Sequence, residues 1–249
     1  MATSTRLFVT QDLTPDQPVV ATSDQAHYLG RVLRLQAGAS VILFNGRDGE
    51  WSATLSEIGR STGLFTLTEQ IRPQIGSPDL WLAFAPVKKT QTDFIVQKAT
   101  ELGVSRLIPL LTERTQSERV KTDRLRATAI EAAEQSERLD IPEISEPVRL
   151  DRLILEWPKE RTLFVCAEAG TAIPLAEAAQ ARKSGAVGFV TGPEGGFSAA
   201  ELDFMHQSPL VLPVGLGPRI LRAETAALAA LAVWQAVAGD GISRPPRRG

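Results

Sequence analysis

The feature that most constrains the fold is an alternation of short apolar runs with helix-like segments, which begins near residue 80 and continues almost to the end of the chain. Each apolar run is followed by a segment with helical character. Apolar strands that alternate with helices predict a parallel sheet covered by helices on both faces. The expected strands are LWLAFAPV (80–87), RLIPLL (106–111), TLFVCAEA (162–169), AVGFVTG (186–192) and LVLPVG (210–215).

Residues 1–72 follow a different pattern. Short β-prone runs alternate with turn signals such as Asn45-Gly46, and one helix is expected over residues 23–35, capped by Ser23 or Asp24. This pattern predicts a small β-barrel with a helix laid against it. The Pro/Gly-rich stretch that follows resembles a linker, so we expect two domains, residues 1–72 and 73–249.

The composition excludes several classes of function. Cys166 is the only cysteine and there are two histidines, so disulfides and cysteine-based zinc sites are excluded and no metal site is expected. No apolar run approaches the ~18 residues of a membrane span, and the N-terminus lacks the pattern of a signal peptide. A cytoplasmic protein without a membrane role is expected. Because the net charge is −2, binding to nucleic acid would depend on local cationic patches.

The loop GPEGG (192–196) is the strongest candidate for a ligand site. Ser198 and Glu201 have the spacing of a capping box, so a helix should begin directly after the loop. The loop therefore lies at the carboxyl end of a strand, where open α/β sheets bind ligands. The phosphate-binding patterns of NTPases and dinucleotide enzymes are absent. A tight turn that needs glycine only for its backbone conformation remains the alternative.

Two further loops have a similar setting. LGPRILRAETAAL (216–228) also joins a strand to a helix through a Gly-Pro turn, and CAEAG (166–170) follows the strand before GPEGG. Because the strand ends of a parallel sheet meet at one edge, we expect the three loops to line one pocket. Arg222 either faces that pocket or forms an ion pair with Glu224, and the sequence leaves both open.

Five separated motifs resemble the RsmE family, within the SPOUT class of RNA methyltransferases. GPEGG and LGPRILRAETAAL carry the resemblance first, and three other stretches agree in the same order along almost the whole chain. These are HYLGRVLRLQAG (27–38), FIVQKATELGVSRLIPLLTER (94–114) and AAEQSERLDIPEI (132–144).

The resemblance implies both a fold and a function. Residues 1–72 would form a PUA-like RNA-binding barrel, and residues 73–249 an α/β domain with a trefoil knot at about 160–240. The protein would be a homodimer that methylates N3 of a uridine in 16S ribosomal RNA, free or in the small subunit. S-adenosylmethionine (SAM) would be held by Ala167, Glu168, Gly192, Pro193, Glu194, Gly195, Gly196, Leu216, Gly217, Ile220, Leu221, Glu224 and Thr225.

The chemistry of the resemblance also suggests roles for charged residues. A cation beside the base would favour the deprotonated N3, which makes Arg222 and Arg219 catalytic candidates, with Glu194 or Glu224 as a candidate proton acceptor. Arg31 and Arg34, three residues apart, are expected on one helical face. The expected RNA contacts are Arg6, His27, Arg31, Arg34, Lys88, Lys89, Arg114 and Arg138.

Three positions depart from the family pattern. Gln91 stands where the family often has Lys or Arg, Glu137 replaces a glycine, and Ala223 replaces a common threonine.

Two other functions stay open: a SPOUT enzyme that methylates a ribose 2′-hydroxyl, and a non-catalytic RNA-binding assembly factor.

Overall fold

The computed structural model describes residues 5–116, 119–166, 172–182, 185–241 and 243. The chain divides into two compact units. The first unit comprises Met1–Gly76 together with Ala133–Ile141, and the second comprises Ser77–Ala132 together with Pro142–Gly249. The sequence did not predict that residues 133–141 belong with the N-terminal unit.

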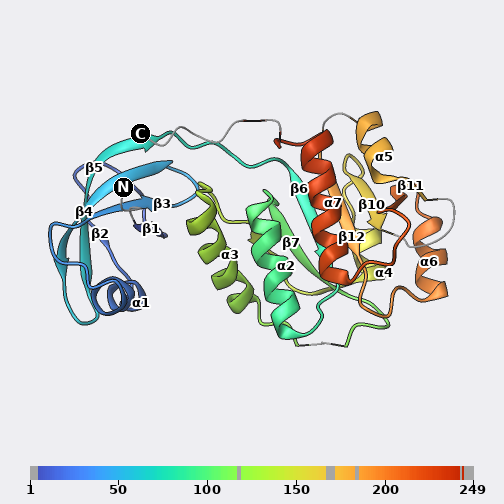
Figure 1. Cartoon of the computed structure of the whole chain (residues 1–249), viewed down its shortest axis with the longest axis horizontal. Helices are drawn as coiled ribbons and strands as arrows, with labels where there is room; N and C mark the ends of the chain where they lie inside the picture. Colours follow the sequence, from blue (N-terminus) through green and yellow to red (C-terminus); the bar gives the residue numbers. More distant parts are fainter. Residues whose placement is uncertain (1–4, 117–118, 167–171, 183–184, 242, 244–249) are drawn as a thin grey trace. The chain divides into compact units, whose positions relative to one another are not determined.

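The first unit is built on a five-stranded sheet with the order β1-β3-β4-β5-β2 (Figure 1). Strand β1 pairs in parallel with β3, and the other pairs are antiparallel. Because β1 and β2 stand at the two ends of this order, the expected barrel is open between them. The strands are β1 (Thr5–Phe8), β2 (Val19–Val20), β3 (Ser40–Phe44), β4 (Glu50–Ile58) and β5 (Gly63–Arg72).

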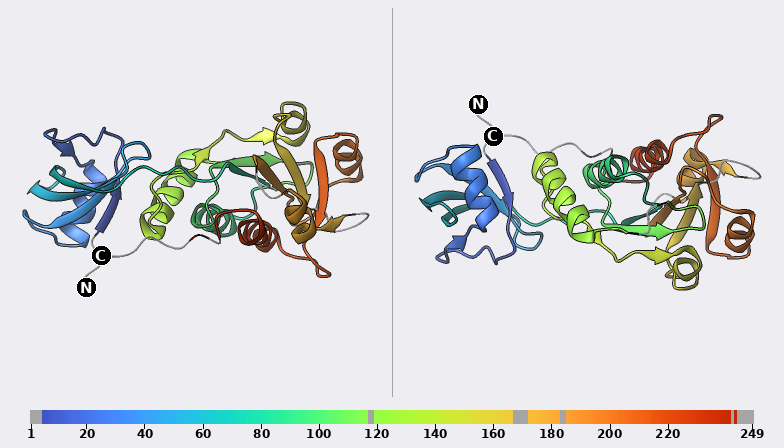
Figure 2. Two further views of the ribbon diagram at one scale, coloured as in Figure 1. Left: turned by 90° about the horizontal axis from the view of Figure 1, so that it is seen from above. Right: turned by 90° about the horizontal axis from the view of Figure 1, so that it is seen from below.

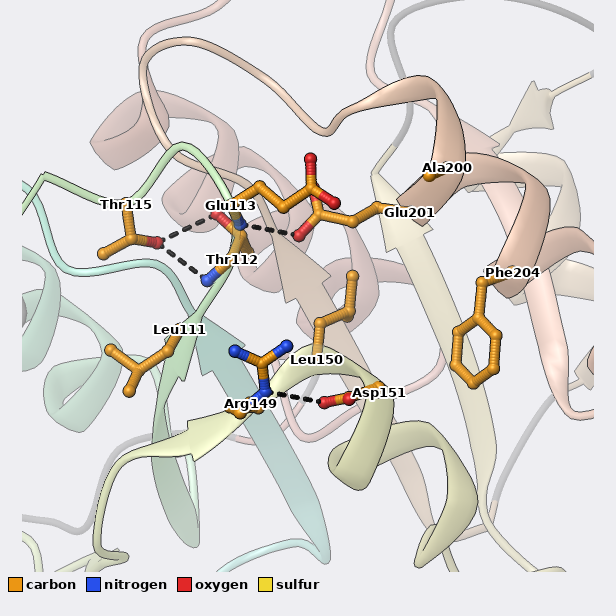
Figure 3. A pocket seen from close by; sticks show the side chains of 10 residues that line it. All are labelled: Leu111, Thr112, Glu113, Thr115, Arg149, Leu150, Asp151, Ala200, Glu201 and Phe204. Carbon is orange, nitrogen blue, oxygen red and sulfur yellow. Dashed lines mark hydrogen bonds and ion pairs between the residues drawn. The ribbon is translucent and has the colours of Figure 1, made fainter.

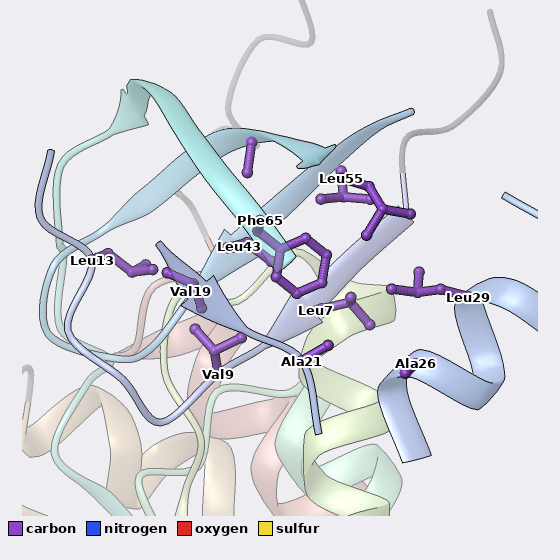
Figure 4. Close-up of a cluster of buried hydrophobic side chains, with 12 residues drawn as sticks. Leu7, Val9, Leu13, Val19, Ala21, Ala26, Leu29, Leu43, Leu55 and Phe65 are labelled. Carbon is purple, nitrogen blue, oxygen red and sulfur yellow. The ribbon is translucent and has the colours of Figure 1, made fainter. Parts of the chain in front are cut away.

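Apolar side chains from the sheet and its helix form the core of this unit (Figure 4). Leu43, Leu55 and Phe65 are fully buried, and Leu29 packs against them from the helical segment. Along most of β3 and β4, buried positions alternate with less buried ones, which places one face of each strand on this core. The helix is therefore held to the sheet by apolar contacts, as the sequence pattern predicted.

The helical segment itself differs from the prediction. It consists of α1 (Ser23–His27) followed by one π-helical turn, η1 (Tyr28–Val32). Its cap is Thr22, whose side chain accepts from the Gln25 backbone N–H in a capping box, so the prediction of Ser23 or Asp24 was wrong. A Gln three residues after a Thr was the signal that could have found it.

A buried ion cluster holds residues 133–138 to this sheet. Glu50, 4% exposed, accepts from Arg6 and Arg72. Arg6 also donates to the carbonyl oxygens of Ala133, Glu134 and Arg138, and Arg72 donates to that of Glu137. These charge-assisted bonds explain why the segment belongs with the first unit.

The second unit has a parallel sheet with the order β11-β13-β10-β12-β6-β7-β8, and β9 pairs with β7. All of its described strand pairs are parallel, which confirms the prediction of a parallel sheet. The strands are β6 (Leu80–Phe84), β7 (Arg106–Leu111), β8 (Glu143–Ile144), β9 (Val148–Arg149), β10 (Thr162–Cys166), β11 (Ile173–Pro174), β12 (Val187–Thr191) and β13 (Val211–Gly215).

Helices cover both faces of this sheet (Figure 2). On one face α7 packs beside α2 and α5, and Trp234 of α7 contacts the stacked rings of Phe164 and Phe189. On the other face lie α4 and α6. The helices are α2 (Lys89–Glu101), α3 (Thr122–Ser136), α4 (Leu150–Leu155), α5 (Leu175–Arg182), α6 (Ala199–His206) and α7 (Ala223–Val237).

Within the described ranges, no helix is long and apolar enough to span a membrane. The same residues contain no group of three or more His, Cys, Asp or Glu side chains that could hold a metal ion.

Candidate functional site

The three loops singled out in the sequence follow neighbouring strands of the second unit. The order β13-β10-β12 places the end of β10 between those of β12 and β13. The GPEGG and LGPRILR loops therefore flank the end of β10 rather than following adjacent strands. Cys166 ends β10, whereas Ala167 and Glu168, predicted to contact the cofactor, lie outside the described residues.

The GPEGG loop has a defined conformation. The Gly196 N–H donates to the carbonyl oxygen of Pro193, and Gly196 has a φ of +66°, a conformation that glycine adopts without strain. Helix α6 begins directly after the loop, capped by Ser198, and the predicted capping box with Glu201 is confirmed. Glu194 and Gly195, at the tip of the loop, are exposed.

Two cationic side chains lie beside this loop. Arg114 donates from Nη1 to the carbonyl oxygen of Gly195 at 2.7 Å. Lys88, the N-terminal cap residue of α2, lines a small pocket together with Arg114 and Glu194. Two of the predicted RNA contacts therefore lie beside the candidate cofactor loop, and Lys89 follows as the first residue of α2.

The LGPRILR loop exposes both catalytic candidates. Arg219 and Arg222 are exposed, and Gly217 has a φ of +106°. Among the described residues no ion pair joins Arg222 to Glu224, so the alternative of a structural pair is not supported. Arg222 caps α7 through its backbone, and its exposed side chain makes no cap hydrogen bond.

Glu224 supplies an independent sign of a ligand. Its Oε2 atom is buried and has no hydrogen-bond partner. An unpaired buried carboxylate oxygen costs free energy unless a donor reaches it. The ammonium, hydroxyl and amino groups of SAM are donors, so the residues at the start of α7 fit such a cofactor. Ala223, where the family commonly has threonine, is buried beside it, 7% exposed.

The predicted RNA contacts of the first unit divide into two groups. His27, Arg31 and Arg34 are exposed. Arg34, however, follows the end of η1 with a φ of +56°, so the prediction that it shares a helical face with Arg31 was wrong.

Arg6 and Arg138 are engaged inside the protein instead. The Arg6 side chain is 7% exposed and four of its N–H donors serve Glu50 and three carbonyl oxygens. The Arg138 side chain is 8% exposed and pairs with Asp140 at 2.9 Å. Both arginines therefore stabilise the first unit, and the structure does not support their prediction as phosphate contacts.

Two departures from the family pattern have a structural outcome. Glu137 has a φ of +60°, so the glutamate keeps the left-handed conformation that a glycine would adopt more easily. Gln91 lies in the first turn of α2, and its Oε1 atom is buried without a hydrogen-bond partner.

Family profiles match both parts of the chain. The profile of an RNA methyltransferase domain matches residues 76–235, and that of an RNA methyltransferase PUA domain matches residues 21–67. The first match covers most of the second unit, including all three loops.

Relatives from several bacteria match over nearly the full length. The ribosomal RNA small subunit methyltransferase E of Rickettsia conorii is 32% identical, over 91% of this chain and 93% of its own. The protein of the same name from Synechocystis is 34% identical, over 91% of this chain and 76% of its own.

A solved structure agrees in fold. The ribosomal RNA small subunit methyltransferase E from Neisseria gonorrhoeae, bound to S-adenosyl methionine, superimposes with a TM-score of 0.87 at 28% identity. That superposition covers 95% of this chain and 99% of the other.

Proposed function

The chain belongs to the ribosomal RNA small subunit methyltransferase E family, and we propose that it transfers the methyl group of SAM to N3 of a uridine in 16S ribosomal RNA. The observation that carries this proposal is that β13, β10 and β12, the strands that lead into the three loops, are neighbours in one parallel sheet inside the matched methyltransferase domain. We assign residues 1–72 to RNA binding and residues 73–249 to catalysis.

The cofactor supplies a methyl group already activated by its sulfonium charge, so the protein's task is positioning and electrostatics. The buried Oε2 atom of Glu224 accepts a hydrogen bond from a donor group of the cofactor. The backbone of residues 192–196 and 216–217, with Ile220, Leu221 and Thr225, encloses the rest. We assign Ala167 and Glu168, which lie outside the described residues, to the same site on the family resemblance alone.

Uridine N3 carries a proton that must leave before the nitrogen can attack the methyl carbon. The exposed guanidinium of Arg222 stabilises the anion that forms on the nucleobase when this proton is lost. Arg219, on the same loop, adds positive charge. Glu194, exposed at the tip of the GPEGG loop, accepts the proton.

The phosphates of the RNA meet the exposed cations of each unit. In the second unit these are Lys88, Lys89 and Arg114, and in the first unit His27, Arg31 and Arg34. Two lysines at the start of α2 face the positive end of the helix dipole, which is unfavourable without a nearby anion. A bound phosphate would offset that repulsion.

Three further features belong to the same proposal. The chain between about residues 160 and 240 forms a trefoil knot, which brings the three loops together. Two copies form a homodimer with the sites at their interface. The protein acts in the cytoplasm, where ribosomal RNA is processed.

The role of Arg222 can be tested by Arg222→Ala. We expect methyl transfer to 16S ribosomal RNA to fall by roughly 10²-fold, the usual cost of losing one charge-stabilising donor, while the affinity for SAM measured by calorimetry changes little. The loss should shrink as pH rises, because hydroxide then removes the N3 proton. Arg126→Ala, an exposed arginine on α3, is the matched control. Wild-type activity in Arg222→Ala would refute the electrostatic role.

A further inference from the structure

A larger cavity of about 480 Å³ opens at the same edge of the second unit's sheet, beside the GPEGG loop (Figure 3). It lies where β7 and β9 end as paired strands, with Leu111 opposite Arg149. Helices α4 and α6 and the segment after β7 form its walls. Neither the proposed cofactor loops nor the predicted RNA contacts line it, so its role is unassigned.

The walls combine an apolar floor with a flat cationic group. Leu111, Leu150 and Phe204 supply the apolar surface. The Arg149 side chain is 75% exposed and forms a 3.3 Å ion pair with Asp151, whose side chain is 54% exposed. An exposed pair of this kind is worth little, so Arg149 can exchange it for a ligand. Aromatic rings and guanidinium planes are the surfaces on which unstacked RNA bases lie.

The cavity also presents an uncommitted carboxylate. The Glu113 side chain is exposed, and within the described part of the chain no hydrogen bond or ion pair engages its carboxylate. Its backbone is fixed, because the Glu113 N–H donates to Oε1 of Glu201 at 2.8 Å. The other oxygen of Glu201 accepts from the Ser198 N–H at 2.9 Å. Glu113 is thus a free acceptor on a rigid support.

The cavity and the candidate cofactor site are contacted by residues that are adjacent in the chain. Glu113 lines the cavity, and the next residue, Arg114, donates to Gly195 of the GPEGG loop. Two consecutive residues therefore contact the two sites. This spacing suits two neighbouring nucleotides of one strand, the target at the cofactor loop and its neighbour in the cavity.

We propose that this cavity binds a guanine base next to the target uridine, through the Glu113 carboxylate and the Arg149 guanidinium, on the apolar floor of Leu150 and Phe204. Guanine is the base that offers two adjacent N–H donors to a carboxylate and, on its other edge, two acceptors to an arginine. The inference rests on the proposed function in that the ligand is RNA. It deepens that function by naming a base that determines specificity.

The test measures base preference directly. Wild-type protein is titrated with five fluorescent pentanucleotides, UUNUU with N as A, C, G, U or inosine, and binding is followed by anisotropy at one salt concentration. We expect the guanine oligonucleotide to bind roughly 10-fold more tightly than the others, because each well-placed base contact is worth ~1–3 kcal/mol. Inosine, which lacks the N2 amino group, should lose much of that preference.

Substitutions then assign the preference to the cavity. Glu113→Gln should bind guanine and inosine equally, because the amide no longer accepts both donors. Asp203→Asn, an exposed carboxylate on α6 outside the cavity, should keep the wild-type preference. Equal affinity of the wild type for all five oligonucleotides, no binding of any of them, or a preference for guanine over inosine that survives in Glu113→Gln overturns the proposal.

This assay needs no methyl transfer, so its outcome is separate from that of the proposed function. A guanine preference that depends on Glu113 in a protein without methyltransferase activity would refute the proposed function and leave the cavity assignment intact. Methyl transfer to uridine without any guanine preference would support the proposed function and refute the cavity assignment.

Discussion

Glu201→Gln should destabilise the second unit although it changes one atom. Glu201 is 9% exposed, and its carboxylate accepts hydrogen bonds from two backbone N–H groups, of Glu113 at 2.8 Å and of Ser198 at 2.9 Å. A glutamine has one acceptor oxygen, so one of these two N–H groups must face an NH₂ group and lose its partner. The sequence predicted the bond to Ser198, whereas the bond to Glu113 joins residues 88 positions apart.

The magnitude follows from these two bonds. A hydrogen bond to a charged group contributes ~1.5–3 kcal/mol, and a buried donor left unpaired costs ~1–3 kcal/mol. The negative charge also favours the first turn of α6. We expect a total loss of about 2–4 kcal/mol, and at 2–4 °C per kcal/mol for a chain of this size the melting temperature should fall by roughly 5–15 °C.

Differential scanning calorimetry and amide hydrogen exchange measure the effect. Exchange should become faster at the N–H of Glu113 or of Ser198 in Glu201→Gln. Ser198→Ala removes only the reciprocal cap bond and should cost about 1 kcal/mol. Glu177→Gln, an exposed carboxylate in the first turn of α5, should change little. A melting temperature and exchange pattern equal to those of the wild type would refute this account of how the loop after β7 is held.

Two further predictions concern the first unit. Burial acts to raise the pKa of Glu50, but the hydrogen bonds and charges of Arg72 and Arg6 outweigh it and hold the pKa below its usual value. The ionised Glu50 therefore contributes stability at pH values above its pKa in the unfolded chain. This contribution is lost as the pH falls through the lower pKa of the folded protein. Glu50→Gln should flatten this acid decline in urea titrations from pH 7 to 3, and an unchanged decline would contradict it. Glu137→Gly should raise the free energy of unfolding by about 0.5–1 kcal/mol, because it removes a glutamate from a left-handed backbone conformation. The control Glu131→Gly, inside α3, should lower it by about 1 kcal/mol. A loss of stability in Glu137→Gly would refute the reasoning.

The second unit was the more predictable part of the fold. Its strands are nearly continuous apolar runs, and residues 187–191 are buried throughout, as a sheet covered on both faces requires. The helix after GPEGG was predicted from a local capping box, because Ser198 and Glu201 lie three residues apart. Local patterns therefore located the candidate cofactor loop.

What the sequence could not show depends on partners far away along the chain. Arg6 looks like a free surface cation until Glu50 and the carbonyl oxygens of residues 133–138 are placed around it. The left-handed backbone of Arg34 follows a π-helical turn that no periodicity predicts. The cavity at Glu113 likewise forms from separate segments, brought together by the pairing of β7 with β9.

The unpaired oxygen of Glu224 shows the same limit. Its position in the sequence made it a candidate for the cofactor site or an ion-pair partner of Arg222, and only its burial without a donor favours the first. Burial and pairing are properties of the folded chain, so they become visible only after the strands and helices are assembled.

The most direct measurement is nucleoside mass spectrometry of 16S ribosomal RNA. RNA and small subunits from cells that lack this modification would be incubated with the purified protein and SAM, then digested to nucleosides. The account predicts that 3-methyluridine appears, close to one per RNA molecule, and depends on both the protein and SAM. A ribose-methylated nucleoside in its place, or no methylated product on either substrate, would contradict it.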